Sequence, residues 1–124
     1  MLDASALLAA LRREPGCQRV IDAMSASVVC SVNFAEVVGK TLDQGKDTKA
    51  IRPWLEGSGV TIEPLTDGDA LIAGELRGLQ GGRGLSLADR CCLALALRLP
   101  ECRVLTADRA WAELALPLRV ELIR

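Results

Sequence analysis

Four acidic residues, each placed just after a predicted strand or in the first turn of a predicted helix, are best suited to do chemistry: Asp3, Glu36, Asp89 and Asp108. A set of oxygen donors without nitrogen or sulfur ligands suits Mg²⁺ or Mn²⁺. One or two such ions could activate a water molecule, orient a phosphate group and stabilise a leaving oxygen. The set therefore suggests phosphodiester hydrolysis, but it does not distinguish RNA from DNA or a nuclease from a phosphatase.

The residue types that the chain lacks narrow the possible chemistry. The chain has no histidine, which excludes Ser-His-Asp and Cys-His triads and the usual zinc enzymes. Its five cysteines form no C-x-x-C pair, so a zinc site is not expected. With no tyrosine, one phenylalanine and two tryptophans, it offers no stacking platform for single-stranded bases. Carboxylates, hydroxyls and arginines remain.

The composition predicts a single domain over residues 1–124. Half of the residues are hydrophobic, and a chain of this length can bury roughly two thirds of its unfolded surface. The formal net charge of -1 gives no overall attraction to nucleic acid, so a polyanionic partner must be held locally. The cysteine usage fits a reducing compartment, and no leader or apolar run approaches the roughly 20 residues of a membrane span. We expect a cytoplasmic protein without membrane contact.

One helix organises the predicted fold. Residues 91–97 contain no polar side chain, and a helix that is apolar all round belongs in the interior. Ser86 can cap its first turn and Pro100 ends it. This places Asp89 in the first turn of a buried helix, where a carboxylate needs a reason to be.

The other predicted elements alternate between helices and strands. Helices are predicted over 4–13, 17–24, 33–44 (capped by Asn33), 47–55, 66–79 and 109–114, with a flexible loop at 81–84. Strands are predicted over 1–2, 26–31, 60–63, 103–106 and 118–123. This alternation favours a parallel sheet covered on both faces, with ligands bound at the carboxyl ends of the strands. All four acids should therefore lie along one edge of the sheet.

Helix capping is the simpler explanation for each acid taken alone. Asn33-x-x-Glu36 and Ser86-x-x-Asp89 have capping-box spacing, and Asp3 and Asp108 could be N-caps. An acid at a helix start contributes about 0.3–1 kcal/mol, whereas two carboxylates about 5 Å apart repel by roughly 3 kcal/mol. If the four acids converge, they require protonation, a distant arginine or a divalent cation.

Four segments, in order along the chain, carry a resemblance to a known family. They are LDASALL at 2–8, SVNFAEV at 31–37, LSLADRCCLALA at 85–96 and VLTADRAW at 104–111. Together they resemble PIN-domain ribonucleases, specifically the VapC-type toxins of bacterial and archaeal toxin–antitoxin pairs. The match extends over nearly the whole chain.

The resemblance implies a three-layer α/β/α fold with a five-stranded parallel sheet, and Mg²⁺- or Mn²⁺-dependent cleavage of RNA, often tRNA. It assigns Asp3, Glu36, Asp89 and Asp108 to the catalytic metal site, with Ser5 and Thr106 as accessory hydroxyls. Arg90 matches either as a phosphate contact or as a structural residue, and Trp111 as a core residue. The resemblance also implies a homodimer and a cognate antitoxin that blocks the acidic groove, often with an arginine.

Two other classes compete with this interpretation. A receiver-like signalling module has a similar fold and an acidic Mg²⁺ pocket, but it needs paired acids after the first strand and a lysine after the last; here no lysine follows Lys49. A catalytically silent PIN domain that acts as a binding partner is the second. Asp67 and Asp69 are expected to be helix-start acids outside the site.

Overall fold

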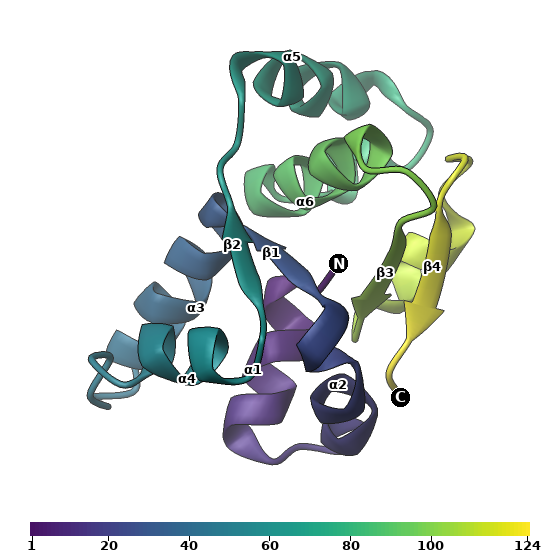
Figure 1. The fold of residues 1–124 in the computed structure, drawn as a ribbon. Coiled ribbons are helices and arrows are strands. Elements are labelled where there is room, and N and C mark those ends of the chain that lie inside the picture. The colour runs from purple at the N-terminus through teal and green to yellow at the C-terminus, as the bar shows by residue number, and fades with distance from the viewer.

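The computed structural model describes residues 1–124 and alternates helices with short strands (Figure 1). The α-helices are α1 (Ala4–Arg12), α2 (Cys17–Ala23), α3 (Ser31–Leu42), α4 (Ile51–Gly57), α5 (Asp67–Glu75) and α6 (Leu87–Arg98). The strands are β1 (Val28–Cys30), β2 (Thr61–Glu63), β3 (Arg103–Thr106) and β4 (Arg119–Leu122). Four short 3₁₀ helices complete the chain: η1 (Met24–Ala26), η2 (Leu76–Gly78), η3 (Gly82–Gly84) and η4 (Arg109–Glu113).

All strand pairs are parallel, and the N-terminal segment joins them. β1 pairs with β2, and β3 pairs with β4. Between these pairs, the backbone N–H of Leu2 donates to Val28 (2.9 Å) and that of Asp3 donates to Leu105 (3.1 Å). The predicted strand at 1–2 is present only as an isolated bridge between Leu2 and Leu105, because α1 already begins at Ala4. The structure therefore has four strands, and the predicted count of five is not confirmed.

The inner strands β1 and β3 and the N-terminal segment are buried on both faces, as a three-layer α/β/α fold requires. Leu2, Val29 and Leu105 pack into one hydrophobic core with α1, α2 and α4. Their neighbours Met1, Cys30 and Val104 point into a second core with α5 and α6. This alternation is the period of two of an extended chain. In Figure 1 the two groups of helices lie on opposite sides of the strands, which confirms the predicted fold class.

The predicted central helix is α6. Residues 90 to 96 of α6 are all buried. The Ser86 hydroxyl accepts a hydrogen bond from the backbone N–H of Asp89 (3.1 Å), and the Asp89 carboxylate accepts one from the N–H of Ser86 (2.7 Å). This reciprocal capping box fixes where α6 begins.

Three local predictions are wrong in detail. Asn33 does not cap a helix, because α3 begins two residues earlier at Ser31 and has no side-chain cap. The long helix predicted over 66–79 ends at Glu75 and continues as η2. The predicted loop at 81–84 contains η3.

None of the helices combines the length with the apolar character needed to cross a lipid bilayer.

Gly16 provides a test of how the C-terminal segment is held. Its φ of +88° is left-handed, and a Cβ atom there would lie 2.4 Å from the carbonyl oxygen of Ile123. Gly45 is also left-handed (φ +68°), but a Cβ there meets no atom within 4 Å. Gly45→Ala should cost about 1–2 kcal/mol of stability, and Gly16→Ala should cost about 1–3 kcal/mol more. Urea unfolding measures both; equal losses would contradict the close packing of Gly16 on Ile123.

Candidate metal centre

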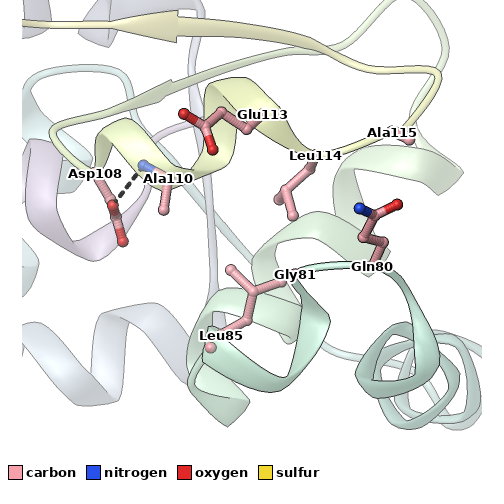
Figure 2. Close-up of a pocket in the computed structure, with 9 residues that line it drawn as sticks. Gln80, Gly81, Leu85, Asp108, Ala110, Glu113, Leu114 and Ala115 are labelled. Carbon is pink, nitrogen blue, oxygen red and sulfur yellow. Dashed lines mark hydrogen bonds between the residues drawn. The ribbon is translucent and has the colours of Figure 1, made fainter.

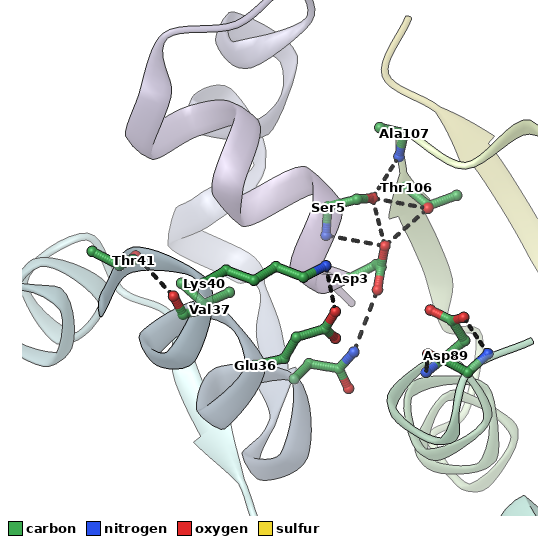
Figure 3. Close-up of polar contacts among 11 residues, drawn as sticks. Asp3, Ser5, Glu36, Val37, Lys40, Thr41, Asp89, Thr106 and Ala107 are labelled. Carbon is green, nitrogen blue, oxygen red and sulfur yellow. Dashed lines mark hydrogen bonds and ion pairs between the residues drawn. The ribbon is translucent and has the colours of Figure 1, made fainter. Parts of the chain in front are cut away.

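The four predicted acids line one hollow. It has a volume of about 240 Å³, and its lining residues are Asp3, Ala4, Ser5, Glu36, Lys40, Ser86, Asp89 and Asp108. Asp3 precedes α1, Glu36 lies on α3, Asp89 lies in the first turn of α6, and Asp108 follows β3. Figure 3 shows Asp3 between Glu36 and Lys40 on one side and Asp89 on the other. Residues distant in sequence thus meet at one place.

Asp3 is the buried centre of this hollow, with only 3% of its surface exposed. Its Oδ2 accepts hydrogen bonds from the hydroxyls of Ser5 (2.5 Å) and Thr106 (3.0 Å) and from the backbone N–H of Ser5 (3.2 Å). Burial raises the pKa of Asp3 above its ordinary value; these hydrogen bonds oppose the rise and the charge of Asp89 adds to it. The carboxylate is therefore oriented firmly but stabilised incompletely as an anion.

Asn33 is a site residue that the sequence reasoning missed. Its amide nitrogen donates to Oδ1 of Asp3 (3.3 Å), and its side chain is completely buried. The signal was its spacing from Glu36 and Lys40, which places the three on one face of a helix once α3 is known to begin at Ser31. Asn33 therefore holds the oxygen of Asp3 that Ser5 and Thr106 leave free.

Asp89 and Asp108 both cap helices and line the hollow. Oδ2 of Asp89 takes part in the capping box of α6, and Oδ1 of Asp108 accepts from the backbone N–H of Ala110 (2.9 Å) in η4. Each cap engages one carboxylate oxygen, which leaves the second oxygen available to a cation. Capping by Asp89 and Asp108 is therefore compatible with their convergence at the hollow. The prediction that Glu36 belongs to a capping box is wrong, because Glu36 lies in the second turn of α3.

Lys40 is the one basic side chain in the lining of the hollow. Its Nζ lies 2.6 Å from Oε1 of Glu36, one helical turn away. The other oxygen of Glu36, Oε2, is buried without a hydrogen-bond partner. An unpaired buried acceptor is costly, so Glu36 retains the capacity to bind a second cation besides Lys40.

The accessory residues divide between the site and the core. Ser5 lines the hollow, and the Thr106 hydroxyl links Asp3 to the backbone N–H of Asp108 (3.0 Å). Arg90 is instead buried, and its guanidinium donates to the carbonyl oxygen of Ala73 on α5 (3.1 Å). This placement favours the structural role of Arg90 over phosphate contact. Trp111 is fully buried in the core, as expected.

The donor set of the hollow fits a hydrated divalent cation. In the structure, no three acidic or cysteine side chains lie close enough together to hold an ion directly. Mg²⁺, however, keeps several waters and usually takes only one or two carboxylates directly. The all-oxygen lining and the unpaired buried oxygen of Glu36 are compatible with such an ion.

A helix-covered parallel arrangement of strands with a carboxylate-lined hollow defines an α/β domain suited to metal-assisted hydrolysis. The chain belongs to the PIN domain family, whose match covers residues 1–116. PIN domains are in general nucleases that depend on Mg²⁺ or Mn²⁺, so the family supports a metal-dependent nuclease and not a receiver-like module. A comparison with curated proteins finds no significant match.

Asp3 and Asp69 should respond oppositely to pH. Burial opposes ionisation of Asp69 as well, but hydrogen bonds from Arg98 and Thr66 outweigh it and lower the pKa of Asp69. As the pH rises from about 3.8 through the raised pKa of Asp3, the ionisation of Asp3 therefore destabilises the folded wild type. As the pH rises from the lowered pKa of Asp69 toward 3.8, the ionisation of Asp69 stabilises it. The difference in Tm between each variant and the wild type removes the pH effects that the two proteins share. This difference should rise with pH for Asp3→Asn and fall with pH for Asp69→Asn. Calorimetry across acid to neutral pH checks the signs; parallel slopes would refute the assigned environments.

Lys40 should compete with a metal ion for Glu36. Lys40→Gln removes the competing charge, so Mn²⁺ should bind about twofold to fivefold more tightly, as measured by titration calorimetry. Arg52→Gln is the matched control, because Arg52 and Glu56 form a similar ion pair (2.8 Å) on α4, away from the hollow. Unchanged or weaker Mn²⁺ binding in Lys40→Gln alone would show that Lys40 does not compete.

Proposed function

We propose that the chain is a metal-dependent endoribonuclease that hydrolyses RNA phosphodiester bonds at the acidic hollow. The observation that carries this proposal is the gathering of Asp3, Glu36, Asp89 and Asp108 around one hollow. Helix capping does not require the four acids to meet, and their mutual repulsion opposes it. Membership of the PIN domain family supports the same chemistry.

The four acids would hold Mg²⁺ or Mn²⁺ in this proposal. When bound, the metal supplies an activated water and charge stabilisation at the scissile phosphate. The chain's own contribution is positioning, since Ser5, Thr106 and Asn33 fix both oxygens of Asp3. The caps at Asp89 and Asp108 orient these two carboxylates from the other side. Such preorganisation removes the need for the site to rearrange during the reaction.

The proposed biological role is that of a VapC-type toxin. The four segments noted in the sequence support it, with tRNA or rRNA as the expected substrate class. A cognate antitoxin would neutralise the enzyme at the acidic hollow, whose carboxylates suit an inserted arginine. A homodimer is also proposed, and the exposed apolar side chains of Leu71 on α5 and Leu87 on α6 are candidates for its interface.

Asp89→Asn is the central test of the proposed function. Asparagine can still accept the N–H of Ser86, so α6 keeps its cap. With Mg²⁺ or Mn²⁺ present, the wild type should cleave members of a panel of tRNAs and rRNA fragments. Asp89→Asn should reduce the cleavage rate by at least about 100-fold. This loss exceeds the usual effect of replacing a residue that only hydrogen-bonds to a metal ligand. Circular dichroism should show an unchanged fold.

Asp67→Asn is the matched control, because Asp67 also lies in the first turn of a helix but does not line the hollow. It should keep wild-type activity. Addition of a chelator should stop cleavage by the wild type and by Asp67→Asn. Cleavage that persists in chelator, or full activity in Asp89→Asn, would exclude the mechanism, and a folded wild type without activity would favour a catalytically silent domain.

A further inference from the structure

A second pocket adjoins the acidic hollow. It has a volume of about 450 Å³ and lies between η4 and the segment that leads into α6 (Figure 2). Asp108 lines both cavities. On the opposite wall, Leu85 lines the second pocket and the next residue, Ser86, lines the hollow. A ligand in the hollow could therefore extend directly into the second pocket.

The lining of this pocket suits a flat, uncharged ring with polar edges. Leu85 and Leu114 provide apolar surface, while the side chains of Gln80 and Glu113 line the pocket without any hydrogen bond or ion pair within the chain. The lining includes two carboxylates, those of Asp108 and Glu113, and no basic side chain. Phosphate is therefore repelled from it, and the volume is within the usual range for small-ligand pockets.

We propose that this pocket binds the base of a nucleotide next to the scissile phosphate, an inference that rests on the proposed nuclease function. Unstacked bases are recognised through hydrogen bonds at their edges. The Glu113 carboxylate is only an acceptor, so it selects a base with an exocyclic amino group. Adenine, cytosine and guanine have such a group. Uracil has none, and its one ring donor, N3–H, lies between two carbonyl oxygens, which a carboxylate repels. Trp111 is fully buried, so recognition uses apolar contact and edge hydrogen bonds without aromatic stacking.

Two variants change the pocket and leave all four acids in the sequence. Glu113→Gln replaces an acceptor with an amide that also donates, which removes the basis for rejecting uracil. Gly84→Leu adds a bulky side chain to the wall of the pocket, where a Cβ meets no atom within 4 Å. Gly74→Leu on α5 is the matched control, since a Cβ there also meets open space and Gly74 lines neither cavity.

The experiment sequences the products of a randomised single-stranded RNA pool cut in Mn²⁺. The wild type and Gly74→Leu should disfavour uracil about tenfold at one position flanking the cut. Glu113→Gln should remove this bias, and Gly84→Leu should flatten the preference among all four bases. A second experiment measures binding without cleavage, with each variant combined with Asp89→Asn so that the RNA stays intact. Sequencing of the RNA that each protein retains should show the same base preferences.

The two readouts separate this inference from the proposed function. If no variant cuts RNA but the bound pool of the wild-type pocket disfavours uracil, the nuclease proposal fails and the base pocket stands. If RNA is cut without a bias against uracil, or with the same bias in Glu113→Gln and Gly84→Leu, the base pocket is overturned and the nuclease proposal stands. The pocket would then be a candidate binding site for a segment of a protein partner.

Discussion

The burial of one carboxylate, that of Asp3, is the constraint on which the site depends. Asp3 ends the short segment that joins the two strand pairs, so its position is set by backbone hydrogen bonds to β1 and β3. Its side chain then accepts hydrogen bonds from residues on α1, α3 and β3. A buried anion is tolerated only where such donors surround it. The fold therefore places three elements around Asp3. These elements and the start of α6 supply the other lining residues of the hollow.

The local and the global roles of the acids reinforce one another. A cap needs one carboxylate oxygen, and the geometry of a helix start directs the side chain toward the edge where the strands end. Asp89 and Asp108 stabilise α6 and η4 and are thereby held toward the hollow. Asp69 has the same capping role in α5, but Arg98 neutralises it (2.8 Å) and it lies outside the hollow. The absence of an arginine beside Asp3, Asp89 and Asp108 distinguishes the site from an ordinary capped helix start.

Local sequence patterns predicted the elements whose signals are local. β3 was predicted at its observed bounds, and the capping box at Ser86 located α6. The start of α3 was not predictable in this way, because the Ser31 hydroxyl accepts from the N–H of Leu65 (3.2 Å) and does not cap the helix. The helix begins two residues before its predicted start, and this difference concealed the roles of Asn33 and Lys40. The convergence of the acids followed from topology. The adjoining pocket depends on η4, which was predicted as a helix, and on η3, which lies in a segment predicted to be a loop.

In the proposed nuclease, the ion pair between Lys40 and Glu36 would connect the binding of a metal ion with the binding of RNA. Any cation that displaces Lys40 from Glu36 frees an ammonium group at the rim of the hollow, where a phosphate could accept its hydrogen bonds. Because such coupling is reciprocal, RNA that engages the freed ammonium would in turn strengthen the hold on the cation. In the proposed nuclease, this single side chain would thus make metal loading and substrate capture cooperative.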